Sequence, residues 1–178
     1  CPDNLFNPNN TRIVSSDDFC AIFGFGVDRS KNAFFGTYVK RHIEYGDAGI
    51  SYSIYRLNTN DQLYVTSFVS LPGVLPIHVA TPPADGWNTY SGDTSVFRYV
   101  GRVGLGDVYV TPDGKTLVAV DMNEDAPKLY FIPINGSGDS VTAGEYSSVH
   151  IPKPATHEGI PCLGKWHPMG IGTRAERI

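Results

Sequence analysis

The sequence predicts an all-β protein of antiparallel strands, and three features of its composition and pattern favour that fold class. Aromatic residues make up 12% of the 178-residue chain, and 19 glycines and 13 prolines supply many turn positions. Apolar and polar residues alternate with period two in residues 50–57, as in a half-buried strand. Helix signals are almost absent. This combination is typical of sandwiches, barrels and propellers.

Individual strands can be placed between turn signals. Residues 21–27 and 33–39 flank a polar turn and are expected to form a hairpin. The segment Thr111-Pro112-Asp113-Gly114-Lys115 is a second turn, because its proline presets φ and its glycine accepts a positive φ. The remaining strands are expected at residues 50–57, 62–69, 106–110, 116–121 and 128–134.

Two stretches of the chain share one plan: a glycine-containing inner strand, a turn, a second strand, a loop and a third strand. The first begins near Gly24 and the second near Gly104, and a weaker third copy begins at Trp166. Repeats of one antiparallel sheet, with glycines where inner strands crowd a central axis, predict β-propeller-like blades. A propeller closes with about four to eight blades, so an incomplete propeller is expected. Residues 20–178 would form this partial domain, which would continue beyond the chain end, after an N-terminal segment at residues 1–19.

Charge and hydropathy exclude two classes of partner. The formal net charge is -4, and lysines and arginines are scattered, so no nucleic-acid partner is expected. The longest apolar stretches are far shorter than the roughly 20 residues that span a bilayer. The N-terminus also lacks a basic segment followed by an apolar one. We therefore expect no membrane insertion, and a signal peptide that has already been removed.

Cysteines and sequons favour an oxidising compartment. Cys1, Cys20 and Cys162 are odd in number and lack C-x-x-C spacing, which favours a disulfide framework with one partner missing over free buried thiols. N-glycosylation sequons at Asn9 and Asn135 agree with this, and the second lies in a Gly/Ser turn. The protein is expected to be a secreted, extracellular or cell-surface glycoprotein.

Five landmarks follow one another between residues 20 and 178. In order, they are Lys40-Arg41-His42, residues 100–107 (VGRVGLGD), residues 111–117 (TPDGKTL), residues 151–154 (IPKP), and Cys162 with residues 166–170 (WHPMG). This order resembles the β-propeller modules of long repetitive surface proteins, of the bacterial SD-repeat adhesin type and its algal and protist relatives.

The resemblance implies a non-catalytic module that serves adhesion or structure in a surface or filament-forming protein. Its partners would be other protein subunits or the remainder of the same polypeptide. In such modules the W-x-P segment usually reads Trp-Arg-Pro and precedes a strand with a second cysteine, whereas His167 stands here in place of the arginine. The resemblance also implies that the partner of Cys162 lies beyond Ile178, and that Cys1 pairs with Cys20.

An enzyme is the first alternative. A propeller hydrolase or lactonase with a channel metal would need carboxylate ligands from several inner strands, and Asp107 is one candidate. Calcium is the cofactor that residues 121–125 (DMNED) suggest, since carboxylates and an amide alternate there. The glycine and glutamate that complete a calcium loop are absent, so we expect an acidic connection and no cofactor. The five histidines lack zinc spacing, and no serine lies in G-x-S-x-G.

A lectin-like, carbohydrate-binding module is the second alternative. Trp87, Tyr90 and Tyr99 lie in the long insertion between the two repeats, where they would suit stacking on glycans or contact with a protein. The competing interpretation is that they cap the insertion against the blades.

Overall fold

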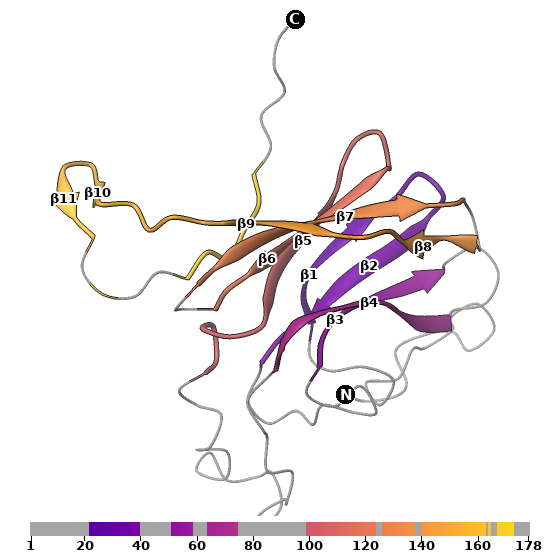
Figure 1. Ribbon diagram of the computed structural model, residues 1–178, viewed down its shortest axis with the longest axis horizontal. Helices are drawn as coiled ribbons and strands as arrows, with labels where there is room; N and C mark the ends of the chain where they lie inside the picture. Colours follow the sequence, from indigo (N-terminus) through magenta and orange to yellow (C-terminus); the bar gives the residue numbers. More distant parts are fainter. Residues whose placement is uncertain are drawn as a thin grey trace, which may run out of the picture.

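The computed structural model describes residues 22–39, 51–58, 64–74, 99–123, 126–137, 140–162, 164 and 167–172. These residues form antiparallel β-sheets and contain no α-helix, which confirms the predicted all-β fold (Figure 1). Within this part of the chain there is accordingly no helix that could cross a membrane.

The first sheet has four strands in sequence order, and each pairs antiparallel with the next. Asp28 closes the turn between the first two strands, because its carboxylate accepts a hydrogen bond from the backbone N–H of Asn32 (2.8 Å). The predicted hairpin is therefore confirmed. The strands are β1 (Ile22–Val27), β2 (Asn32–Thr37), β3 (Ser51–Asn58) and β4 (Tyr64–Val74), the last longer than predicted.

The second sheet repeats this plan. In its first turn, Asp113 accepts hydrogen bonds from the Thr111 hydroxyl (2.6 Å) and the Lys115 backbone N–H (3.0 Å), while Gly114 takes a φ of +72°. The predicted turn is thus correct. The sheet contains β5 (Leu105–Val110), β6 (Thr116–Asp121) and β7 (Lys128–Asn135), and β7 pairs in turn with the short strands β8 (Thr142–Ala143) and β9 (Ser147–His150).

The last described residues leave this sheet and return to it. Strands β10 (Thr156–His157) and β11 (Ile160–Pro161) form a small hairpin that projects away from both sheets in Figure 1. Residues 167–172 then lie beside β5, where the Asp107 N–H donates a hydrogen bond to the Met169 carbonyl (2.8 Å). A third repeat was predicted here, and its described part is bonded to β5 without forming a strand.

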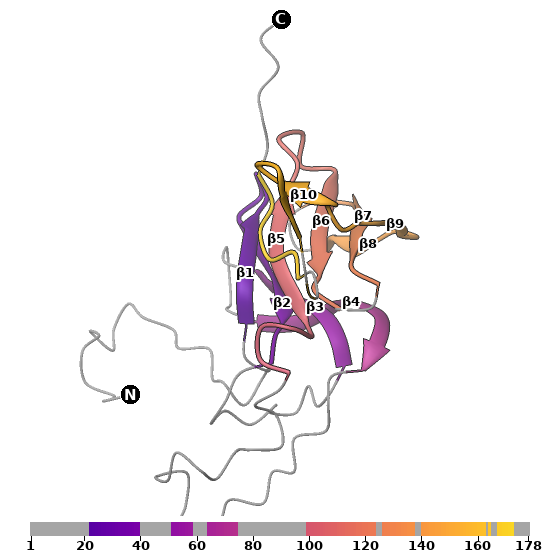
Figure 2. The same ribbon diagram turned by 90° about the vertical axis from the view of Figure 1, so that its left-hand side faces the viewer.

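The two sheets meet where β1 and β2 pack against β5 (Figure 2). The approach is close because glycines occupy the contact. A Cβ on Gly24 would come within 2.7 Å of the Val108 nitrogen, and a Cβ on Gly36 within 2.8 Å of the Leu105 Cβ. Glycines thus permit the close approach of β1 and β2 to β5, and their place on inner strands of a propeller stays a prediction.

A single hydrophobic cluster fills the space between the sheets. Phe34 and Ile54 contribute from the first sheet, and Leu105, Leu117 and Ile132 from the second; all five are fully buried. Burying a side chain of this size stabilises the fold by about 1.5–3 kcal/mol. The described residues therefore share one core. They show two large antiparallel sheets and the two-stranded β10–β11 hairpin, fewer than the roughly four blades of a closed propeller.

Candidate functional site

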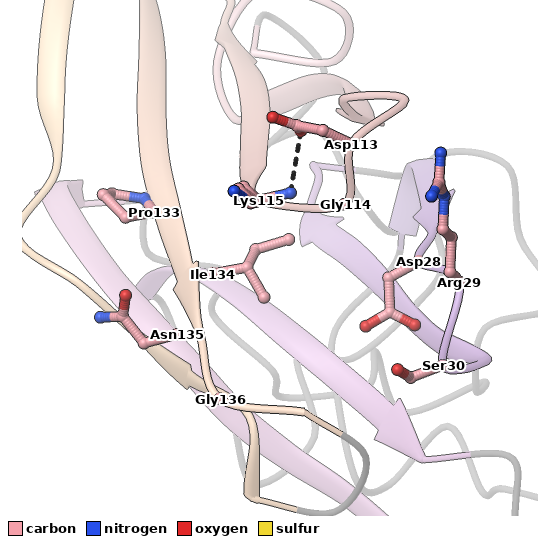
Figure 3. Close-up of a pocket in the computed structure, with 10 residues that line it drawn as sticks. All are labelled: Asp28, Arg29, Ser30, Asp113, Gly114, Lys115, Pro133, Ile134, Asn135 and Gly136. Carbon is pink, nitrogen blue, oxygen red and sulfur yellow. Dashed lines mark hydrogen bonds between the residues drawn. The ribbon is translucent and has the colours of Figure 1, made fainter.

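An open groove of about 570 Å³ lies where three segments of the two sheets end (Figure 3). Asp28, Arg29 and Ser30 reach it from the β1–β2 turn, and Asp113 and Lys115 from the β5–β6 turn. The end of β7 supplies the third side, which runs from Pro133 to Gly136. No sequence motif indicates this groove, because it arises only when the two sheets pack together.

Hydrogen bonds fix the turns on either side of the groove. The Arg29 guanidinium donates to the Pro112 carbonyl (2.6 Å) and so joins the turn of the first sheet to that of the second. The Ile134 N–H donates to the Lys115 carbonyl (2.8 Å), which ties β7 to the β5–β6 turn. The groove is thus held at two of its edges by contacts between separate segments.

The groove carries charges of both signs. The Thr111 hydroxyl, followed by the Lys115 backbone N–H, lowers the pKa of the exposed Asp113 carboxyl, which is therefore an anion near neutral pH. Arg29 and Lys115 add two cations and Asp28 a second carboxyl. The ten lining residues include no histidine, cysteine or aromatic residue. This groove can therefore bind polar or charged groups, but it offers neither a group that titrates near pH 7 nor a stacking surface.

Asn135, predicted to carry a glycan, lies at the edge of this groove. It is the last residue of β7 and pairs in register with Thr142, so the sequon begins at a strand end and not in the turn that was predicted. Gly136 then turns the chain with a φ of +85°. Asn135, Gly136 and Ser137 are all exposed. A glycan at Asn135 would extend into solvent beside the groove, and its presence stays a prediction.

The predicted disulfide partners fall only partly within the described residues. Cys162 follows β11, is half-buried and carries a free thiol, and its backbone N–H donates to the Ala155 carbonyl (3.0 Å). Cys1, Cys20 and the sequon at Asn9 lie outside the described part of the chain. The implied pairings stay predictions.

One of the three candidate contact aromatics is described. Tyr99 is half-buried and packs against the hydrophobic core, and its carbonyl accepts hydrogen bonds from the N–H groups of Arg102 (2.9 Å) and Val103 (3.1 Å). This arrangement agrees with the capping interpretation for Tyr99. Trp87 and Tyr90 lie outside the described residues, and a role in binding stays a prediction for all three.

A buried polar junction between the sheets was not predicted. Tyr52 on β3 and Asp121 at the end of β6 are 2% and 4% exposed, and the Tyr52 hydroxyl is hydrogen-bonded to the Asp121 carboxyl. The Gly104 N–H donates to the Tyr52 oxygen (2.7 Å), and the Asn123 N–H donates to Asp121 (2.9 Å). Burial raises the pKa of Asp121, and burial together with the Asp121 charge raises the pKa of Tyr52.

The sequence does contain a signal for this junction. The pattern of residues 121–125 predicts an acidic connection that begins at Asp121, yet Asp121 continues the period-two series of Leu117 and Ala119, both of which are fully buried. A carboxylate at the next position of an inward-facing series indicates a buried partner.

A second polar junction is centred on Arg56 of β3, which is 8% exposed. Its Nε donates to the Asn32 side-chain oxygen (2.9 Å), and one terminal nitrogen approaches the Val141 carbonyl (3.4 Å). Asn32 in turn donates to the Asp28 carboxylate (2.7 Å). The network therefore connects the first sheet to the segment before β8 and ends at the groove.

Asp107, the candidate ligand of a channel metal, has a structural role in the described residues. Its carboxylate accepts hydrogen bonds from the N–H groups of Val108 (3.0 Å) and Ile171 (3.2 Å). The Nδ1 of His167 lies 3.3 Å from the Met122 carbonyl oxygen. Among the residues that the structure describes, no three histidine, cysteine or carboxylate side chains gather as metal ligands would.

The chain has no significant match to a protein-family model, a curated protein or a solved structure. Its function is therefore inferred from the residues described above.

Proposed function

We propose that the chain is a non-catalytic structural or adhesive module of an extracellular surface or filament-forming glycoprotein, and that its sheets are blades of a β-propeller. The observation that carries this proposal is the contact between β1 and β5, the first strands of two sheets with the same strand order. Blades of a propeller are four-stranded sheets arranged in this way around a central axis.

Close approach at a glycine occurs both between the two sheets and between β5 and residues 167–172. A Cβ on Gly24 would collide with the backbone of Asp107, and a Cβ on Gly106 would lie 2.6 Å from the Met169 carbonyl oxygen. Residues 167–172 thus lie against β5, as β5 lies against β1, although the contacting positions differ. Further sheets, from other subunits or from the remainder of the same polypeptide, would continue the series.

The polar side chains support a rigid module in preference to a catalytic one. The carboxylates of Asp107 and Asp121, both considered as metal ligands, accept backbone hydrogen bonds. The bond from Ile171 to Asp107 joins two separate segments, and the bond from Asn123 to Asp121 is local. The groove between the turns supplies only fixed charges and hydrogen-bonding groups. Surfaces of this kind suit contact with other protein subunits or with glycans.

Exposure of the sequon at Asn135 supports the extracellular assignment. The test is expression of the chain through a eukaryotic secretory pathway, followed by peptide mass spectrometry. We expect a glycan on the Asn135 peptide that is lost in the matched Asn135→Gln variant, and Cys162 in a mixed or intermolecular disulfide. Unmodified Asn135 together with a reduced Cys162 would contradict the extracellular proposal.

Metal analysis of the same secreted material separates this proposal from the enzyme alternative. The structural module should bind no stoichiometric ion. One tightly bound ion per chain, lost in an Asp107→Asn variant that still folds, would contradict the non-catalytic assignment and favour a hydrolase or lactonase.

A further inference from the structure

Asn135 and Gly136 form the only Asn-Gly dipeptide in the chain. They lie where β7 ends at the rim of the groove, and both residues are exposed (Figure 3). An asparagine side-chain amide is attacked most readily by the next backbone nitrogen when glycine follows, because glycine has no Cβ to hinder the approach. The end of β7 therefore carries a pair of residues that can react with each other.

The structure leaves the reacting atoms of this pair accessible. Apart from strand pairing, neither the Asn135 side chain nor the Gly136 N–H makes a hydrogen bond within the described residues. The Asn135 side-chain nitrogen lies over Gly144, where a Cβ would come within 2.9 Å of it, so a glycine at this position leaves room for the amide. Because Asn135 is the last residue of β7, rotation of the bond that follows it disrupts no later pair of that strand.

The Asp113-Gly114 turn on the other side of the groove is the contrasting case. Its glycine N–H donates a hydrogen bond to the Thr111 carbonyl (2.8 Å), so the backbone nitrogen is held in place. Its carboxylate accepts hydrogen bonds from the Thr111 hydroxyl (2.6 Å) and the Lys115 N–H (3.0 Å). The same kind of dipeptide is thus held by its turn at one rim of the groove and is unrestrained at the other.

We propose that Asn135 is a site of succinimide formation in the folded chain, and that the glycan proposed above for the same side-chain nitrogen blocks this reaction. The Gly136 nitrogen attacks Cγ of Asn135 and forms a bond with it. The bond from Cγ to Nδ2 breaks, and ammonia leaves with the proton that the Gly136 nitrogen gives up. Water then opens the ring at one of its two carbonyls and leaves aspartate or isoaspartate at position 135. The site is independent of the proposed function, whereas its protection rests on the glycan.

Isoaspartate at position 135 would loosen the end of the second sheet. The main chain would then run through the former side chain, which inserts a methylene group into the backbone and displaces the pairing of Asn135 with Thr142. Strand β8 pairs with β7 through two residue pairs, and this is one of them. Val141 directly precedes β8, and its carbonyl lies 3.4 Å from a terminal nitrogen of Arg56. The modification would therefore extend to the buried network around Arg56.

The first test uses the full chain produced without glycosylation in a bacterial host and incubated in native buffer at mildly alkaline pH. We expect the Asn135 peptide to gain the mass difference between an amide and a carboxyl group, and to accept methyl groups from an isoaspartate-specific methyltransferase. Asn123 is equally exposed but precedes a glutamate, so its peptide should stay intact in the same sample. The Asn135→Gln variant should lose the methyl acceptance, because the longer side chain must close a larger ring.

The second test compares the secreted wild type with Ser137→Ala. This variant removes the sequon but keeps the Asn-Gly pair and the backbone hydrogen bond from the Ser140 N–H to the residue 137 carbonyl. We expect no conversion of glycosylated Asn135 and a return of the conversion in Ser137→Ala. In the modified chain, the backbone amides of β8 should exchange hydrogen faster than before, while those of β6 should be unchanged.

Each remaining outcome rejects a specific part of the proposal. An intact Asn135 peptide in native buffer, or conversion only in urea, would show that the folded strand end prevents ring closure and would overturn the site. Equal conversion of Asn123 would overturn the role of Gly136. If the unglycosylated chain is modified but the secreted chain carries no glycan, the extracellular proposal fails and the site stands. If glycosylated Asn135 is converted as fast as the residue in Ser137→Ala, the protective role is overturned.

Discussion

The Tyr52 hydroxyl and the Asp121 carboxyl form a hydrogen bond across the junction of the two sheets, with both side chains almost fully buried. Tyr52 belongs to the first sheet and Asp121 to the second, and the Gly104 N–H also donates to the phenol oxygen. Burying polar groups is costly unless each has a partner. This network therefore favours one relative placement of the sheets over others that an apolar core alone would permit.

Replacing Tyr52 with phenylalanine tests the strength of this junction. The Tyr52→Phe variant keeps the ring but removes the acceptor of the Gly104 N–H and one partner of the Asp121 carboxyl, which retains its hydrogen bond from the Asn123 N–H. We expect the free energy of unfolding to fall by about 1–3 kcal/mol, as measured by urea denaturation. The matched control is Tyr109→Phe, on a half-buried tyrosine of β5 whose hydroxyl has no bond within the described residues. An equal loss in both variants would contradict a specific role for Tyr52.

The buried carboxyl of Asp121 should make stability depend on pH. Burial raises its pKa in the folded state, so the folded chain retains a proton at pH values where the unfolded chain, with a pKa of about 3.9, has released it. The stabilising contribution is therefore fully present below the unfolded pKa and is lost as pH rises through the folded pKa. Relative to Asp121→Asn, the wild type should lose stability as the pH rises above the unfolded pKa of about 3.9, until the folded-state carboxyl has ionised as well.

Asp113 provides a control of opposite sign. Hydrogen bonds from Thr111 and Lys115 lower its pKa, so its contribution is present above the unfolded pKa and is lost as pH falls through the folded pKa. As the pH rises, the urea midpoint of the wild type should thus increase relative to that of Asp113→Asn, whereas it should decrease relative to that of Asp121→Asn. If the difference in urea midpoint between wild type and asparagine variant changed with pH in the same direction at both positions, burial would not control the pKa of Asp121.

The strands of the two sheets could be predicted because their signals are local. Alternation in residues 50–57 and the turn at residues 111–115 depend on neighbours in the sequence, and the structure contains a strand at Ser51–Asn58 and the predicted turn. The expectation of a half-buried strand was wrong, because residues 52–56 are all buried, polar side chains included. The strands β8 and β9 had no such signal, since they are two and four residues long and β9 is entirely exposed. Short edge strands are defined by pairing with β7, which a periodicity argument does not detect.

The candidate sites were less predictable because they depend on pairing between distant segments. The sequon at Asn135 is a local motif, and its exposure agrees with expectation. Tyr52, however, finds its Asp121 partner on the other sheet, and Arg56 bonds both to Asn32 on the neighbouring strand and to the segment before β8. The charged groove likewise combines two turns and a strand end that are separated along the chain.

Arg56 should contribute to stability through its hydrogen bonds. In Arg56→Met, the Asn32 oxygen and the Val141 carbonyl lose a donor in a buried setting while most of the side-chain volume remains. We expect a loss of about 2–3 kcal/mol in the free energy of unfolding, since bonds to charged groups lie at the upper end of the usual range. The exposed Arg102→Met should change it by less than about 0.5 kcal/mol. Similar values for the two variants would contradict the proposed importance of the Arg56 network.

The glycines of β1 allow a graded test of the contact between the sheets. A Cβ on Gly24 would overlap the Asp107 backbone and lie 2.7 Å from the Val108 nitrogen, whereas a Cβ on Gly26 would find its nearest neighbour, the Val110 nitrogen, at 3.0 Å. Backbone atoms cannot move aside as the end of a flexible side chain can, so Gly24→Ala should destabilise by about 2–3 kcal/mol. Gly26→Ala should cost about 1 kcal/mol or less, because a shift of a few tenths of an ångström suffices and alanine reduces the entropy of the unfolded chain. Urea denaturation of the two variants measures the difference. If Gly24→Ala were as stable as Gly26→Ala, β1 and β5 could not be as close as the repeat of sheets requires.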